Sequence, residues 1–150
     1  MGASGWEYYV PYNADPLAVL AELHRRVLAE RAYYWGNEEV PRPGTLAELH
    51  RLYEDEGNDG LAADGTHSIL DIYQVNPAGA PDEFGTIRPL SMQEAQTAFG
   101  TSTPARNQFE AVYQGGMGPL ADVPRWSGRY TTLYDGDTPV QIVVWGCSGD

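Results

Sequence analysis

Residues 129–147 read RYTTLYDGDTPVQIVVWGC, and this stretch decides the fold class. Two segments rich in β-branched and aromatic residues, 129–134 and 140–147, flank a short polar turn. The Asp135-Gly136 step in that turn favours the tight reversal of a β-hairpin. The sequence therefore predicts two adjacent antiparallel strands here, to which strands from earlier in the chain add.

Apolar patterns upstream predict further strands. Aromatic and β-branched residues alternate over residues 6–12, which favours a strand that Pro11 ends or confines to a sheet edge. The apolar run at 67–75 is the best candidate for a central strand, and residues 85–88 are a candidate for a short one.

Helix signals lie between these strands. Leucines at helical spacing follow Pro16, and a second apolar helix follows the capping box at residues 45–48. Shorter helices are expected after Ser91, which opens another capping box, and after Thr103-Pro104. Residues 58–65, rich in glycine and aspartate, are expected to form a loop.

The order of these elements lacks the regular strand–helix alternation of a doubly wound α/β protein. We therefore expect an α+β fold: a largely antiparallel sheet of about four to five strands, ending in the hairpin, with two longer and one or two short helices packed on it. A chain of 150 residues is long enough for one hydrophobic core and too short for two. Residues 1–150 are expected to form a single compact domain.

The charge is strongly one-sided, with 21 acidic residues against nine basic ones and a net charge of −12. Such a field repels phosphate backbones and anionic lipids, so neither nucleic acid nor membrane is an expected partner. It favours a basic protein partner through faster encounter. The alternative is that the acidity serves only to keep the protein soluble.

All nine basic residues are arginine, because the chain contains no lysine. A Walker A loop, a protein-kinase site and a pyridoxal Schiff base each require a lysine. The sequence excludes these classes of chemistry, and we expect no cofactor.

Targeting and metal signals are weak. The longest apolar run, residues 142–145, is too short to span a bilayer, and residues 1–5 lack the features of a signal peptide, so we expect a cytoplasmic protein. The histidines form no metal-binding motif, and the acidic loop at residues 55–60 lacks the key ligands of a calcium loop, so no metal site is expected. His24 and His50 are interpreted as packing residues, and the single Cys147 as a structural thiol.

Residues 64–71 hold the best catalytic candidates, because they combine a histidine, two hydroxyls and two carboxylates. His67 and Asp71 are the candidate acid–base pair. The alternative is that the polar side chains of this segment only satisfy backbone groups where loop meets strand. An enzyme of this kind would hold an anionic substrate with an arginine, namely Arg88, Arg106 or Arg129.

Aromatic residues are abundant, with ten tyrosines and four tryptophans. Tyrosine, tryptophan and arginine carry much of the binding energy at protein interfaces, although the same aromatic residues also serve well in a core. The candidate binding residues are Tyr33, Tyr34, Trp35, Arg125, Trp126 and Arg129.

The sequence favours a non-enzymatic, acidic protein-binding module, such as an inhibitor, immunity-type or regulatory partner of a basic protein. A small enzyme that acts on an anionic small molecule through His67 is the alternative, and a small-molecule pocket lined by Tyr and Trp is a third possibility. The binding module is preferred because no complete catalytic constellation is present.

Overall fold

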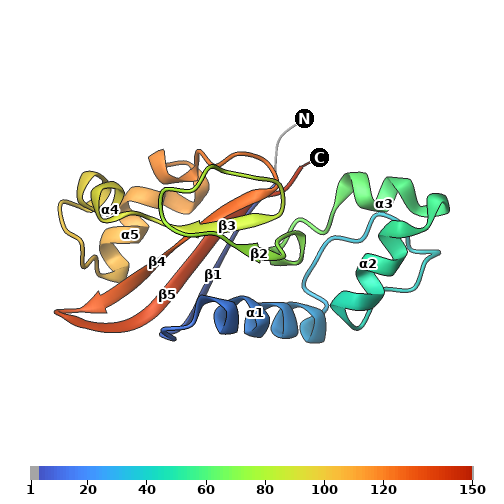
Figure 1. Cartoon of the computed structure of the whole chain (residues 1–150), viewed down its shortest axis with the longest axis horizontal. Coiled ribbons are helices and arrows are strands. Elements are labelled where there is room, and N and C mark those ends of the chain that lie inside the picture. The colour runs from blue at the N-terminus through green and yellow to red at the C-terminus, as the bar shows by residue number, and fades with distance from the viewer. Residues whose placement is uncertain (1–3, 150) are drawn as a thin grey trace.

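The computed structural model describes residues 4–149 as a five-stranded mixed sheet with helices on both faces (Figure 1). The strand order is β1-β5-β4-β3-β2, with antiparallel β1–β5 and β5–β4 pairs and parallel β4–β3 and β3–β2 pairs. The α+β class and the C-terminal hairpin are confirmed. The strands are β1 (Gly5–Pro11), β2 (Gln74–Val75), β3 (Thr86–Pro89), β4 (Ser127–Asp135) and β5 (Thr138–Cys147).

Strand β5 separates two hydrophobic layers. Ile142 and Val144 face the layer that contains α1 (Pro16–Glu30), whereas Val143 and Trp145 face the layer that contains α5 (Arg106–Tyr113). Because successive side chains of a strand point to opposite faces, a strand covered on both sides is apolar without alternation. This explains the continuous apolar run that the sequence shows here.

The helices begin at the positions that their capping residues predicted. Asp15 accepts a hydrogen bond from the Leu17 amide at the start of α1. Thr45 accepts one from the Glu48 amide at the start of α2 (Leu46–Glu54). The Ser91–Glu94 capping box opens α4 (Met92–Phe99), and α5 spans Arg106–Tyr113. Figure 1 shows α4 and α5 on the opposite side of the sheet from α1, and α2 and α3 (Asp59–Asp64) beyond one end of it.

The predicted central strand at 67–75 is wrong. Residues Ile69–Asp71 form a 3-10 turn, and β2, which supplies the only pairing of this segment, lies at the sheet edge. Ser68 accepts a hydrogen bond from the Leu70 amide and thereby caps the turn. The apolar residues are buried by this turn rather than by strand alternation, and an apolar run alone does not distinguish the two.

The loop expected at residues 58–65 is wrong in part, because most of this segment is helical. Residues Asp59–Asp64 form the short helix α3, and its Leu61 is buried. Among the described helices, none has the length and hydropathy needed to cross a membrane.

Phe109 tests the layer formed by α4 and α5. Its ring is fully buried and lies 5.1 Å from that of Trp145, centroid to centroid. We expect Phe109→Ala to lower the free energy of unfolding by about 3–5 kcal/mol, because it removes ring contacts and leaves a cavity. Urea denaturation measures this, with Met92→Ala on the exposed side of α4 as the control that stays close to wild type.

Candidate functional site

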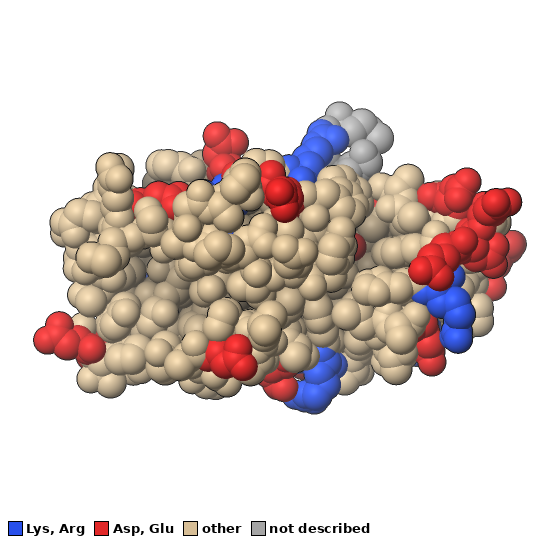
Figure 2. Space-filling model, in the orientation of Figure 1, with Lys and Arg blue, Asp and Glu red and all other residues tan. Residues whose placement is uncertain are grey.

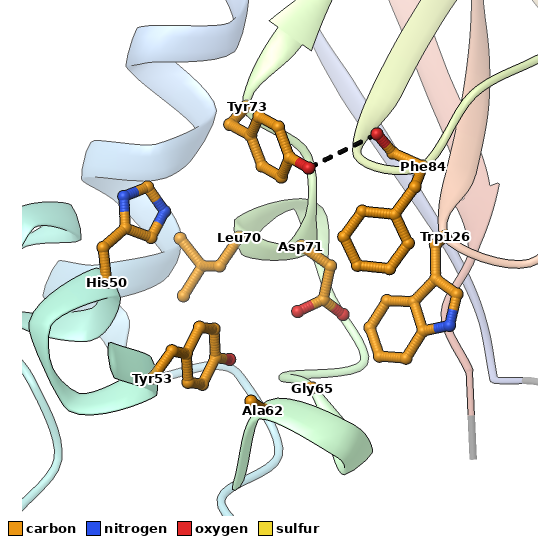
Figure 3. A pocket seen from close by; sticks show the side chains of 9 residues that line it. All are labelled: His50, Tyr53, Ala62, Gly65, Leu70, Asp71, Tyr73, Phe84 and Trp126. Atoms are coloured by element: carbon orange, nitrogen blue, oxygen red, sulfur yellow. Dashed lines mark hydrogen bonds between the residues drawn. The ribbon is translucent and has the colours of Figure 1, made fainter. Parts of the chain in front are cut away.

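A pocket of about 220 Å³ lies between α2, the segment from residue 62 to 73, and the turn that precedes β3 (Figure 3). Its walls are mostly apolar and aromatic. Ring-bearing side chains surround one carboxylate in it: His50, Tyr53, Tyr73, Phe84 and Trp126 around Asp71. We call this the aromatic pocket.

The rings of the aromatic pocket form a continuous wall. The His50 and Tyr73 rings are 6.3 Å apart and nearly perpendicular, and Tyr73 and Phe84 are also 6.3 Å apart. Phe84 lies 5.3 Å from Trp126. Because Tyr73 and Phe84 are 49% and 60% exposed, they form the rim through which solvent reaches the pocket.

Asp71 is the polar centre of the pocket and is only 7% exposed. Its Oδ1 accepts hydrogen bonds from the Thr66 amide and hydroxyl, both at 2.8 Å. Its Oδ2 accepts a hydrogen bond from the Ser148 hydroxyl at 2.5 Å. In the described part of the chain, no arginine lies within ion-pair distance of this carboxylate. The pocket therefore contains a buried carboxylate that is hydrogen bonded but forms no ion pair with any of residues 4–149.

The turn that carries Asp71 is held by α1. His24 Nε2 donates to the carbonyl oxygens of Ile69 and Ile72, at 3.2 and 2.8 Å. Burial is the main cause that lowers the pKa of His24 from its ordinary value of 6.5, although the two carbonyls oppose the shift. The neutral imidazole thus fixes the backbone on both sides of Asp71.

Two glycines allow the rings to pack against the backbone. Gly65 and Gly85 both have φ values in the left-handed region, +70° and +75°. A Cβ at Gly65 would lie 2.5 Å from the Trp126 ring, and one at Gly85 would overlap the Tyr73 ring. Any larger residue at these positions would displace a wall of the pocket.

Trp126 is held in an unusual backbone conformation. Its φ is +63°, a region that a bulky residue rarely occupies and that costs about 1–3 kcal/mol. Two backbone hydrogen bonds maintain it: the Trp126 amide donates to Cys147 at 2.8 Å, and its carbonyl accepts from Gly85 at 2.6 Å. The sheet therefore imposes the strain that directs the indole into the pocket.

Tyr53 supplies a second polar group. Its hydroxyl is buried and has no hydrogen-bond partner among the described residues. Burial raises the pKa of Tyr53, and the Asp71 charge raises it further. The hydroxyl therefore stays protonated close to the carboxylate.

An ion-pair network fixes the loop that ends in Phe84. Asp82 Oδ2 lies 2.6 Å from the Arg129 guanidinium, and Asp82 Oδ1 lies 3.2 Å from Arg88. Arg88 also pairs with Glu94 of α4 at 2.8 Å. These contacts hold the β2–β3 loop against the sheet and so position the rim of the pocket.

The predicted binding residues have separate places in the structure. Tyr33 and Trp35 are core residues, and their side chains donate to the carbonyls of Pro43 and Val40. Arg129 is buried in the Asp82 ion pair, and Arg125 is exposed beside Trp126. Tyr34 is partly exposed and stacks on His67 at 4.4 Å. Trp126 is the member of the predicted set that lines the pocket.

The two predicted catalytic residues, His67 and Asp71, contact different residues in the structure. His67 Nδ1 lies 3.1 Å from the Ser4 hydroxyl, and its ring stacks on Tyr34. Asp71 lines the pocket and is bonded by Thr66 and Ser148. An acid–base role for His67 with Asp71 stays a prediction. The candidate substrate arginines pair with carboxylates: Arg88 and Arg129 with Asp82, and Arg106 with Glu110.

Four ring-bearing residues of the pocket were not predicted as site residues: His50, Tyr53, Tyr73 and Phe84. Nothing in their spacing connects them, because they come from three separate segments. The sequence feature that could have indicated the pocket is the pair of glycines, Gly65 and Gly85, each of which lies beside a polar or aromatic turn. Within residues 4–149, no group of histidine, cysteine and carboxylate side chains is arranged to hold a metal ion.

Comparison with protein-family models, curated proteins and solved structures gives no match for this chain.

His24 makes stability depend on pH. Because its folded-state pKa lies below 6.5, the unfolded chain binds the proton more readily, so stability is lost as pH falls from about 6.5 towards the folded-state value. His24→Gln keeps an N–H donor without this titration. We expect urea denaturation at pH 7.5 and 5.5 to show a larger loss for wild type than for the variant. Equal losses would contradict this role for His24.

A substitution of Asp82 tests whether its ion pairs hold the β2–β3 loop in place. Asp82→Ala leaves the two guanidinium groups, which are 9% and 13% exposed, without this partner. We expect the free energy of unfolding to fall by roughly 1–3 kcal/mol, because partly buried charges lose their pairing. Glu22→Gln, which removes an exposed pair with Arg25, is the control and should leave stability unchanged in the same denaturation experiment.

Proposed function

We propose that this chain is a non-enzymatic binding module for a basic protein, and that the aromatic pocket holds one cationic side chain of that partner. The observation that carries the proposal is the Asp71 carboxylate, buried beneath a wall of aromatic rings with no described cation beside it.

The chemistry of the pocket suits a cation. The faces of Trp, Tyr and Phe rings attract cations, by about 0.5–1 kcal/mol at exposed sites and about 2 kcal/mol when water is excluded. A buried carboxylate is costly unless it is paired and hydrogen bonded. A cation that enters between the rings gains both interactions and completes the pairing of Asp71.

The size of the pocket suits a side chain. Sites for drug-sized ligands have volumes of roughly 300–1,000 Å³, whereas this pocket holds about 220 Å³. A nucleotide or a large metabolite would not fit inside it. The end of one long side chain would.

The surface around the pocket supports a basic partner. Figure 2 shows acidic side chains gathered at the end of the molecule where α2 and α3 lie. Those exposed on these elements and the turn between them include Glu54, Asp55, Glu56 and Asp59. Since α2 also provides His50 and Tyr53, the charges stand beside the pocket and steer a basic surface towards it.

Trp126→Asn is the sharpest test of this function. Asparagine tolerates the left-handed backbone, so the variant removes the indole without adding strain. We expect immobilised wild-type protein to retain basic proteins from a cell lysate at low salt and release them at high salt, and the variant to retain at least tenfold less.

Matched controls remove other effects. Tyr12→Asn deletes an exposed aromatic residue that does not line the pocket, and Asp137→Asn deletes an exposed charge in the hairpin turn. Both should retain the same proteins as wild type, whereas Asp71→Asn should lose them. Retention by Trp126→Asn at the wild-type level would disprove binding through this pocket.

A further inference from the structure

We infer that the cation held by the aromatic pocket is a methylated lysine ammonium, with the dimethylated form preferred over unmodified lysine and over arginine. This inference rests on the proposed function and specifies its ligand. It follows from the hydrogen-bonding capacity that Asp71 has left, from the nature of the walls and from the composition of the chain.

The carboxylate of Asp71 has room for one more hydrogen bond. A carboxylate offers about four lone-pair positions, two on each oxygen. Thr66 occupies both positions on Oδ1, and Ser148 occupies one on Oδ2. An arginine fork needs one acceptor position on each of two oxygens. Because Oδ1 is saturated, a guanidinium group cannot bind this carboxylate in its preferred bidentate manner.

A primary ammonium is also a poor match. It has three N–H donors, whereas the lining side chains that offer an acceptor are Asp71, through its remaining position, His50 and Tyr73. The other walls are rings and the aliphatic groups of Leu70 and Ala62. A donor that points at one of these apolar walls is buried without an acceptor, which costs about 1–3 kcal/mol.

A dimethylammonium group fits these constraints. Its single N–H matches the single open position on Asp71. Its two methyl groups replace the surplus donors with apolar surface against the rings of Tyr73, Phe84 and Trp126. The positive charge is retained, so the attraction of the ring faces is retained too.

The source of the group is another protein. The exposed rings of Tyr73 and Phe84 at the rim provide apolar contact for a long alkyl stem. A second copy of this chain contributes no lysine side chain, because the sequence contains none. The acidic surface beside the pocket favours a lysine that lies in a basic segment.

The test uses small probes with one variable group. N-acetyl-lysine methylamide is titrated in unmodified, dimethylated and trimethylated forms, together with the arginine and the neutral norleucine analogues. The readout is the Trp126 indole N–H resonance, assigned by its loss in Trp126→Asn. We expect the dimethylated probe to bind about tenfold tighter than the unmodified and arginine probes, and norleucine not to bind. The trimethylated probe should fall between, because it lacks the N–H.

Two variants check the contacts. In Asp71→Asn we expect the preference for the dimethylated over the trimethylated probe to disappear, because the charged acceptor is gone. Tyr12→Asn should bind all the probes as wild type does. The remaining amide resonances report whether each variant is folded.

The outcomes separate the two proposals. If unmodified lysine or arginine binds as tightly as the dimethylated probe, the methylation inference is overturned while the proposed function stands. Tighter binding of the trimethylated probe overturns the role given to the N–H. If no cationic probe binds better than norleucine, the proposed function fails as well.

Discussion

The hydrogen bond from Ser148 to Asp71 joins the end of β5 to the turn that builds the pocket. The two residues are 77 positions apart in sequence. Ser148 also accepts a hydrogen bond from the Trp6 indole at 3.2 Å, which brings β1 into the same network. Because each buried polar group strengthens its neighbours in a low dielectric, this chain of contacts fixes the sheet edge, the strand end and the turn together.

The same network explains how the protein tolerates a buried carboxylate. Three donors from two residues replace the water that Asp71 loses on folding. These donors stabilise the charge without cancelling it, so the field of the carboxylate still acts on the space between the rings. The glycines at 65 and 85 and the Asp82 ion pairs keep the rings in place before any ligand arrives. A site formed in advance loses less conformational entropy on binding.

Local signals predicted the local structure well. The Asp135-Gly136 turn and the capping residues Thr45 and Ser91 lie where the structure uses them, because each acts through neighbours only a few residues away. The strand prediction for residues 67–75 was wrong because the Ser68 hydroxyl and the Asp71 carboxylate accept hydrogen bonds from backbone amides. These bonds bend the chain into a turn.

The pocket could not be predicted in the same way. Its walls come from α2, the turn at Asp71, the loop before β3 and the residue that precedes β4. Only tertiary packing brings these segments together. Local sequence patterns predict helices and strands, but not which of them come into contact. Trp126 was found through its residue type, whereas Tyr33 and Trp35, chosen on the same ground, proved to be core residues.

The left-handed backbone conformation of Trp126 lowers the stability of the fold, whereas its indole forms part of the binding pocket. Glycine or asparagine would suit the φ of +63° better than tryptophan does. A laboratory selection for thermal resistance alone would therefore tend to replace the indole and empty the pocket, whereas a selection for ligand retention would keep it. Stabilised versions of this fold are best engineered with residue 126 held constant.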